Sequence, residues 1–461
     1  MNNINTNVNY SCWKTIILTF AAAALLLVFS GCFSPWEGDG TLTIDLGGGD
    51  LSRAAINSNE IANFDYEIIL EGPGGKITKT VKGGGAITLE LAPGTWDLML
   101  RAIGDRPDDD PLGDYKLSEY FPPRMLRALG FDNAVDVKAG KNTRVTLKMT
   151  AAMEVENKEQ LYQATQMFYS FDKPGIFIIK KGFSYDGNFY LEGQDLTLIT
   201  DNTDKEVELI FTDKSTRIFV LYSNTSLVKP SALTLGRPGM KGSLVLNGNG
   251  EDSPRLGSIV SVGNDCTLIV YDGVKLRNNL NNDPSGNPGG GVFVDSGTFI
   301  MHGGEVSGNV VQNNGNNGGY GGGVYVEGTL EMHGNSRISG NKVMAGTGYG
   351  ATGGNGGGIH VASGIFIMSG GEISGNTADG SNNSSPSSGR GGGVYISEGE
   401  YFEKTGGVIY GNNGEDSSNY ATQAGEAVYS YSMFFENKYR DDDVWDNISY
   451  IRGDFGGKWN E

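Results

Sequence analysis

The chain has 461 residues, with 54 acidic and 35 basic residues and only three His and three Cys, and its formal net charge is −19. Because so acidic a chain repels a phosphate backbone, we expect no nucleic-acid partner. Three scattered Cys and three His do not supply a zinc site with the usual ligand spacing, so we expect no metal and no cofactor. Glycine is the unusual component, and 39 of the 72 glycines fall within residues 281–420.

Residues 1–31 have the pattern of a secretory signal peptide. Lys14 precedes an apolar run from Ile16 to Phe29, and 14 residues are too few to span ~30 Å of hydrocarbon as a helix. The run ends in Phe29–Cys32 (FSGC), which resembles a bacterial lipobox of the spirochaete type. This resemblance implies cleavage before Cys32, lipid on Cys32 as the membrane anchor, and a place at the bacterial outer membrane, on the cell surface or the periplasmic face. A plain signal peptide with an accidental Cys, or an uncleaved anchor, is the alternative.

Residues 32–40 are interpreted as a tether, and residues 41–150 as a small β-sandwich. Turn-forming residues separate short alternating segments at 41–46, 65–70, 86–91, 95–100 and 144–149. These segments resemble prealbumin-like or carboxypeptidase-regulatory-type sandwiches, which implies a spacer domain. We expect Trp96 in the core. The loop Asp108–Asp110 is expected to be solvated rather than to bind Ca²⁺.

Residues 151–175 are interpreted as a capping helix and linker. Asn157 is a good N-cap residue, and Leu161, Ala164, Met167 and Phe168 recur at helical spacing, which predicts an amphipathic helix over residues 157–169. Such a helix would cover the open hydrophobic end of a solenoid.

Residues 176–461 are interpreted as a right-handed parallel β-helix of the pectin-lyase-like kind with a C-terminal cap. Four segments align, at 289–309, 321–341, 356–376 and 391–412, with starts 32, 35 and 35 residues apart. Each opens with Gly-Gly-Gly before an aliphatic residue and closes on Gly-Asn. The aligned cores have nearly constant length, whereas the Gly-, Asn- and Ser-rich joins between them vary, which is typical of coils that carry one insertion each. Each core divides into three short strands.

Stacked coils place equivalent residues above one another, so sequence columns become ladders. Asn309, Asn341, Asn376 and Asn412 are predicted to form a structural ladder of amide hydrogen bonds. Phe293, Tyr325, His360 and Tyr395 are predicted to form an outward aromatic column, which either stiffens the sheet or contacts a glycan or protein partner. His302 and His333 should stack on the outer surface without binding a metal.

The pattern SGN…GGGVY resembles the FxxN and GGA[ILV] repeats of polymorphic outer-membrane proteins, and more closely the Gly-rich repeats of adhesin-like surface proteins. The resemblance implies adhesion, or binding of an unidentified glycan or protein, through the β-helix. Polysaccharide lyases and glycosidases use the same fold, but no acid–base constellation recurs at coil spacing, so an enzyme is not expected. A carbohydrate-active enzyme and a passive surface-coat spacer are the alternatives.

Overall fold

The computed structural model describes residues 38–46, 60, 63–170, 174–200, 205–214, 217–223, 229–252, 254–284, 286, 288–312, 318–346, 353–381, 388–397, 400–412, 416–430 and 454–455. The predicted signal peptide, Cys32 and most of the predicted tether lie outside these residues. Within them, no helix combines the length and apolar character needed to cross a bilayer.

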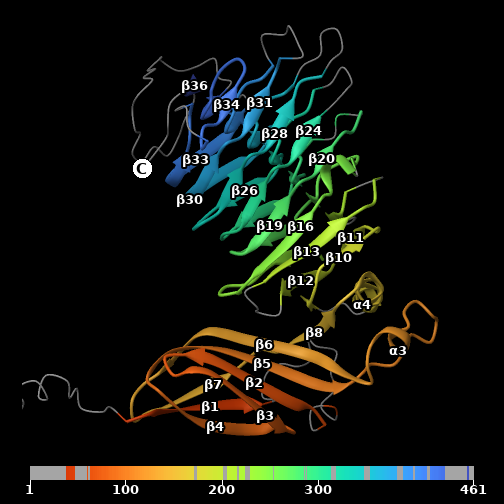
Figure 1. Cartoon of the computed structure of the whole chain (residues 1–461), viewed down its shortest axis with the longest axis vertical. Helices are drawn as coiled ribbons and strands as arrows, with labels where there is room; N and C mark the ends of the chain where they lie inside the picture. Colours follow the sequence, from red (N-terminus) through yellow and green to blue (C-terminus); the bar gives the residue numbers. More distant parts are fainter. Residues whose placement is uncertain are drawn as a thin grey trace, which may run out of the picture.

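The N-terminal unit is a sandwich of two sheets, at the bottom of Figure 1. In the smaller sheet, β1 (Gly40–Leu46) pairs antiparallel with β4 (Gly85–Leu91) and parallel with β7 (Asn142–Thr146). In the larger sheet the antiparallel order is β3 (Gly75–Lys82), β2 (Asp65–Gly72), β5 (Gly94–Asp105), β6 (Arg124–Val137) and β8 (Thr150–Val155). The strands alternate between buried and exposed residues because each sheet turns one face to the shared core.

Trp96 lies fully buried in this core, as predicted, and its Nε1 donates a hydrogen bond to the Ala92 carbonyl at 2.9 Å.

The side chains of the acidic loop Asp108–Asp110 are held by hydrogen bonds. The Asp109 carboxylate accepts hydrogen bonds from the backbone N–H and hydroxyl of Ser118, which lies in α3 (Leu117–Tyr120). Asp110 accepts from two backbone N–H groups of its own loop. These hydrogen bonds give both carboxylates a structural role.

The larger sandwich sheet continues without a break into the second unit. Strand β8 pairs antiparallel with β6 on one side and parallel with β9 (Gly175–Ile179) on the other. Helix α4 (Lys158–Ser170) lies between β8 and β9 in the chain, and Asn157 caps it by accepting a hydrogen bond from the Gln160 N–H at 2.9 Å. The predicted helix is therefore present. Its predicted apolar face is buried against the first coil.

Side chains also join the two units beside the shared sheet. The amide of Asn133 donates to the Pro238 carbonyl at 2.6 Å, and the Arg237 guanidinium lies 5.0 Å from the ring centre of Phe131. Lys241 forms an ion pair with Glu71. A hydrogen bond, a cation–π contact, an ion pair and a continuous sheet at one junction hold the solenoid in a fixed orientation on the sandwich.

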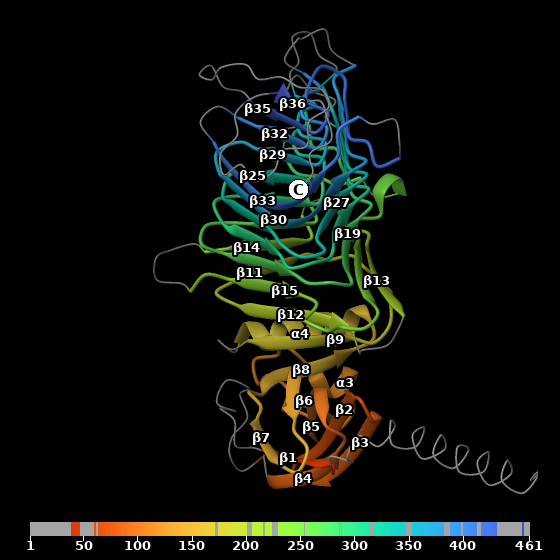
Figure 2. The same cartoon turned by 90° about the vertical axis from the view of Figure 1, so that its left-hand side faces the viewer.

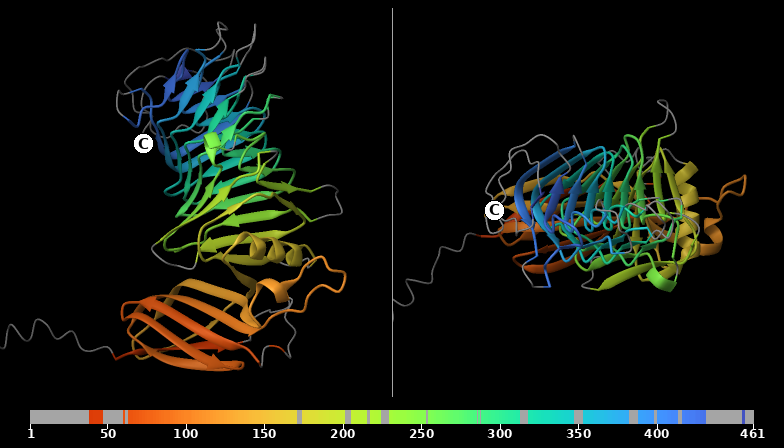
Figure 3. Two further views of the ribbon diagram at one scale, coloured as in Figure 1. Left: turned by 45° about the vertical axis from the view of Figure 1, so that its right-hand side comes forward. Right: turned by 90° about the horizontal axis from the view of Figure 1, so that it is seen from above.

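The second unit is a parallel β-solenoid whose coils follow one another away from the sandwich (Figures 1 and 3). Equivalent strands of successive coils pair with one another, and we call each such series of strands a stack. Stack one contains β9, β12 (Asp195–Thr200), β15 (Ala232–Leu235), β18 (Thr267–Val270), β22 (Thr298–Met301), β26 (Thr329–Met332), β30 (Ile365–Ser374) and β33 (Tyr401–Ile409). Stack two contains β10 (Phe183–Tyr185), β13 (Glu206–Phe211), β16 (Ser243–Asn247), β19 (Val274–Arg277), β23 (Glu305–Ser307) and β27 (Arg337–Ser339), and it merges into β30. A short 3₁₀ helix, η2 (Gly250–Asp252), follows β16.

Stack three contains β11 (Phe189–Glu192), β14 (Phe219–Tyr222), β17 (Val260–Val262), β21 (Val292–Val294), β25 (Val324–Val326), β29 (Ile359–Val361), β32 (Val394–Ile396) and β35 (Val428–Ser430), with β36 (Asp454–Phe455) antiparallel at its end. Stack four contains β20 (Leu280–Asn281), β24 (Val310–Gln312), β28 (Lys342–Met344), β31 (Thr377–Asp379) and β34 (Tyr420–Ala421). The three predicted strands of each core are present. The joins, expected to be loops, begin with this fourth strand.

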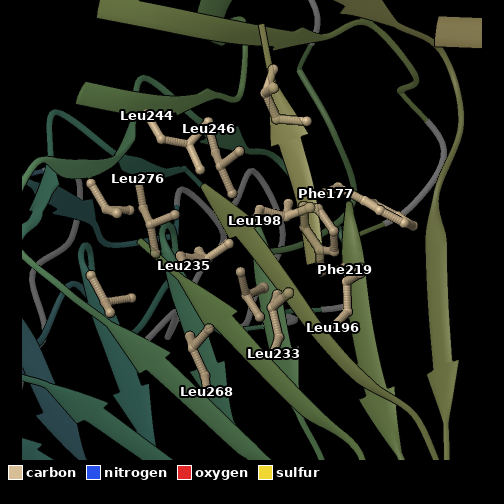
Figure 4. Close-up of a cluster of buried hydrophobic side chains, with 14 of the residues drawn as sticks. Phe177, Leu196, Leu198, Phe219, Leu233, Leu235, Leu244, Leu246, Leu268 and Leu276 are labelled. Atoms are coloured by element: carbon tan, nitrogen blue, oxygen red, sulfur yellow. The ribbon is translucent and has the colours of Figure 1, made fainter. Parts of the chain in front are cut away.

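The solenoid interior is filled by columns of aliphatic and aromatic side chains. In the early coils Leu196, Leu233 and Leu268 pair in register along stack one, and Figure 4 shows them packed with leucines of stack two. In the later coils the aliphatic column Val292, Val324, Ile359 and Val394 is fully buried. The free thiol of Cys266 is buried as well. Burial of these apolar side chains is the dominant favourable contribution to folding.

Candidate functional site

The predicted aromatic column exists on the outer side of stack three. Phe293, Tyr325, His360 and Tyr395 stand directly above one another in the strand register. Their successive ring centres lie 5.7, 5.1 and 4.6 Å apart. Tyr429 of β35 extends the column by one more ring at 5.3 Å. Figure 2 shows the strands that carry these rings following one another.

This column is partly covered: Phe293 and His360 are buried, whereas Tyr325, Tyr395 and Tyr429 are half-buried. Phe293 is only 8% exposed and His360 only 5%. Tyr320, from the join before β25, presses edge-on against His360 with ring centres 5.1 Å apart. Arg217 and Arg390 lie over the end rings of the column, Phe293 and Tyr429, at 5.2 and 4.8 Å. The rings therefore contact one another and their cover, which favours the stiffening role and leaves little surface for a ligand.

Burial also sets the protonation of this column. Desolvation lowers the pKa of His360 to about 4, although a hydrogen bond with the Asn355 carbonyl opposes that shift. Desolvation raises the pKa of the Tyr325 hydroxyl as well, with a contribution from the neighbouring Glu327 carboxylate. Both groups are therefore neutral at ordinary pH, as an apolar outer layer requires.

The Asn ladder is present, with one member different from the prediction. The Nδ2 of Asn309 donates to the Oδ1 of Asn341 at 3.0 Å, and Asn341 repeats this contact with Asn376 at 3.0 Å. The next member is Asn419, whose Oδ1 accepts from Asn376 at 3.0 Å. Asn412 was predicted here and is wrong: it is exposed, because the last coil carries its insertion before the ladder position instead of after it.

The ladder satisfies buried backbone groups on both sides of each coil. Asn341 Nδ2 also donates to the Val306 carbonyl at 2.9 Å, while Asn341 Oδ1 accepts from the Asn309 N–H at 3.0 Å. The series begins one coil earlier than predicted, at Asn279, whose N–H donates to Asn309 Oδ1. In Asn341 and Asn376 the amide donors and acceptors are used inside the fold, so these amides are structural.

His302 and His333 stack as predicted, with ring centres 5.5 Å apart, and Tyr271 extends the pair at 5.2 Å. His333 contacts Ser369 Oγ through Nδ1 at 2.6 Å and Glu331 Oε2 through Nε2 at 3.1 Å. Both ring nitrogens of His333 are thus already engaged. No group of three or more His, Cys, Asp or Glu side chains in the described ranges is arranged to hold a metal ion.

One cluster of charged side chains converges on the solenoid surface. Glu206 lies 2.8 Å from Lys275 and 3.0 Å from Arg277, and Arg277 also reaches Glu208 at 2.9 Å. Lys275 and Arg277 together hold the pKa of Glu206 below its usual value. None of these four residues lines a cleft described here. Their charges neutralise one another, which is the behaviour of a structural ion-pair network.

A cleft rich in tyrosine lies where α4 meets the first coils, and sequence reasoning did not single it out. It has two adjoining parts of about 380 and 510 Å³, which share Tyr162, Tyr185 and Asn188. Three more tyrosines line it: Tyr120, Tyr190 and Tyr222. Tyr162 of α4 is 49% exposed and Tyr190 of β11 is 45% exposed. We call this site the tyrosine cleft. In Figure 2, α4 lies at the base of the coils, below β11 and β14.

The floor of the tyrosine cleft is a rigid stack of rings. Tyr185 stacks on Phe189 with centres 4.8 Å apart, and Phe189 stacks on Phe219 at 4.6 Å. Burial raises the pKa of Tyr185 to about 12, so its hydroxyl is protonated at neutral pH. Because the rings below are packed in the core, the exposed rings above them sit on a fixed base.

The walls of the tyrosine cleft carry polar atoms. Asn188 Oδ1 and Gln194 Oε1 are buried and have no hydrogen-bond partner in the described part of the chain. A buried acceptor without a donor costs about 1–3 kcal/mol. Glu192 accepts a hydrogen bond from the Tyr222 hydroxyl at 3.0 Å, which orients both side chains. Both amide oxygens are closed to solvent, so a ligand hydroxyl reaches them only when these side chains turn toward the cleft. The exposed aromatic faces are the feature that suits ligand binding.

The sequence did contain a trace of this site. Residues 183–192 are dense in aromatic residues, and Tyr162 lies outside the predicted buried face of the helix. The helical spacing of apolar residues identifies only the side that the helix buries. Residues of α4 and β11 line one cleft although β9 and β10 lie between these elements in the chain, and this depends on how the helix lies across the coil.

Comparisons with known protein families, with curated proteins and with solved structures find no match for this chain. The site therefore has to be interpreted from its own geometry.

Proposed function

We propose that this protein is a lipid-anchored protein of the bacterial outer membrane that binds a glycan or protein partner through its β-helix, without catalysis. The observation that carries the proposal is the open tyrosine cleft. Exposed aromatic side chains gathered in a cleft are typical of binding sites, because they give a large contact area at a low cost in conformational entropy.

The arrangement of the two units supports a display role. The first described strand, β1, lies in the sandwich sheet that is farther from the solenoid, and the later coils lie at the opposite end of the molecule (Figure 1). A lipid on Cys32 would anchor the sandwich end, and the fixed junction through β8 and β9 would then hold the solenoid away from the membrane. Of the two possible faces of the membrane, our proposal is the cell surface.

The alternatives are a carbohydrate-active enzyme and a passive spacer. Among the charged groups of the cleft, Glu192 is bonded to Tyr222, and Asp186 lies 3.4 Å from Lys158. A glycosidase needs two carboxyl groups facing each other across the scissile bond, whereas Glu192 and Asp186 are engaged with Tyr222 and Lys158. A passive spacer gives no reason for the two exposed tyrosines at the cleft.

The anchoring half of the proposal is tested by growing cells with a labelled fatty acid and comparing wild type with Cys32→Ser. We expect label on the wild-type chain, loss of label and of membrane association in Cys32→Ser, and no change in Cys12→Ser, the matched control. Protease treatment of intact cells should remove the wild-type protein. Label retained by Cys32→Ser would contradict the lipid anchor.

The binding half is tested with the detergent-solubilised full chain on arrays of glycans and of extracellular-matrix proteins. We expect at least one binder on these arrays. Release of shortened products from a bound glycan would favour the enzyme, and a chain that binds nothing on either array would favour the spacer.

A further inference from the structure

The tyrosine cleft has the chemistry of a saccharide site, and we infer that it binds a neutral oligosaccharide. The inference rests on the proposed binding function and names its site and ligand class. Three independent properties of the cleft carry it: the exposed rings, the acceptors without donors, and the sign of the surrounding charge.

The exposed rings come from two different elements. Tyr162 projects from α4, and Tyr190 projects from β11, and both line the smaller part of the cleft, of about 380 Å³. Aromatic faces carry negative potential and attract the weakly positive C–H groups on the apolar face of a sugar ring. Because Tyr162 also lines the larger part, the two parts form one path along which several linked sugar units fit better than one.

The acceptors define what the ligand must offer. Asn188 Oδ1 and Gln194 Oε1 lack donors, and Glu192 keeps its carboxylate at the same wall. When the amide side chains turn toward the cleft, a ligand rich in hydroxyl groups brings the donors that these oxygens lack, and a sugar presents hydroxyls around the whole rim of its ring. A purely apolar ligand would leave the two amide oxygens unsatisfied.

The charge around the cleft selects among sugars. Its lining includes the carboxylates of Glu159, Asp186 and Glu192 but only one basic side chain, Lys158, which pairs with Asp186. The whole chain is acidic as well, with a net charge of −19. A uronic-acid polymer would meet like charge at the cleft and be repelled, so a neutral glycan fits and an acidic one does not.

The position of the cleft explains why it stays open. Tyr190 occupies the same outward column of stack three as Val220, Ser261 and Phe293, as the strand register shows. From Phe293 onward the rings of the column are buried or half-buried, whereas Tyr190 remains 45% exposed at the end next to α4. The helix and the first coil thus form a wall and a floor with a free opening.

The test uses the detergent-solubilised full chain and two sets of probes: neutral hexasaccharides of glucose, xylose and mannose, and the acidic hexasaccharide of galacturonate. We expect at least one neutral probe to bind, and Tyr162→Ala and Tyr190→Ala each to weaken that binding about tenfold, near the usual value of one aromatic stacking contact. Tyr190→Phe, which keeps the ring, should retain binding.

Tyr420→Ala is the matched control, because Tyr420 is 47% exposed but lies on β34 in the last coils. It should bind like the wild type. An unchanged unfolding midpoint in all variants separates loss of contact from loss of fold.

Three results would overturn the inference and leave the proposed function standing: neutral probes that bind both tyrosine variants at full strength, preference for the galacturonate probe, or binding of matrix proteins alone. Failure to bind any glycan or protein would overturn the inference and the proposed function together.

Discussion

The two ends of the outer side of stack three show how one structural position takes two roles. At the end next to α4, Tyr190 is 45% exposed and lines an open cleft. Three and five coils further on, Phe293 and His360 stand in the same column but are 8% and 5% exposed, because Arg217 lies over Phe293 and Tyr320 packs against His360. An outward aromatic residue in a solenoid is therefore accessible to a ligand only where no other side chain lies over its ring.

The covered end also differs in what holds its coils together. The Asn ladder runs through the later coils from Asn279 to Asn419. In the coil before, a Cβ on Gly248 would lie 2.6 Å from the Cβ of Asn279. The early coils, in contrast, are held mainly by their leucine-rich interior. We therefore expect stability at the covered end to depend on the Asn ladder and the stacked rings, which take no part in binding at the tyrosine cleft.

The largest expected effect is on the ladder. Asn341→Ala leaves the Val306 carbonyl and the Asn309 N–H buried without partners, so we expect a loss of about 4 kcal/mol in the free energy of unfolding, from two orphaned groups. Denaturant unfolding measures it. Asn412→Ala, at an exposed residue, should change stability by no more than about 0.5 kcal/mol. A comparable loss in Asn412→Ala would contradict the assignment of Asn419 to the ladder.

The next effect depends on pH. The pKa of His360 in the folded protein, about 4, lies below that of an unfolded histidine, about 6.5, so the unfolded chain takes up this proton first as the pH falls. The stability contributed by neutral His360 is complete above about pH 6.5 and is lost as the pH falls to about 4, in total about 3 kcal/mol.

His360→Phe keeps a ring in the column but removes this titration. The difference in unfolding free energy between wild type and His360→Phe should therefore move in favour of the variant between about pH 7 and about pH 4. A difference that stays constant over this range would show that His360 is not held neutral by burial.

The smallest expected effect separates the covered column from the tyrosine cleft by their contributions to stability and to binding. Tyr395→Ala removes a ring stacked between His360 and Tyr429, and we expect a loss of about 2 kcal/mol in stability with unchanged ligand binding. Tyr190→Ala should do the reverse, with a stability change within about 0.5 kcal/mol and weaker binding. Thermal unfolding and the saccharide probes measure the two quantities on the same samples. If Tyr395→Ala also lost binding, the covered column would be a ligand site after all.

The repeat pattern predicted much of this fold. The Gly-Gly-Gly opening and the closing Gly-Asn recur in the four aligned segments, and the structure confirms the coil register through Asn309, Asn341 and Asn376. The glycines are required there because backbone from the next coil passes close: a Cβ on Gly323 would meet the Gly358 carbonyl oxygen at 2.7 Å. The prediction went wrong at Asn412, where a Gly-Asn pair recurs in sequence but an insertion shifts the spatial equivalent to Asn419.

By itself, the sequence determined the class of fold, the period of the coils, the buried columns and the identity of the column that faces outward. These follow from local rules, because alternation along a strand and repetition between coils decide which side chains face the core. Only the tertiary structure decided which outward residues are open. That depends on where the joins and α4 lie over the coils, which involves contacts between residues far apart in the chain. For this reason the covered column was visible in the sequence and the tyrosine cleft was not.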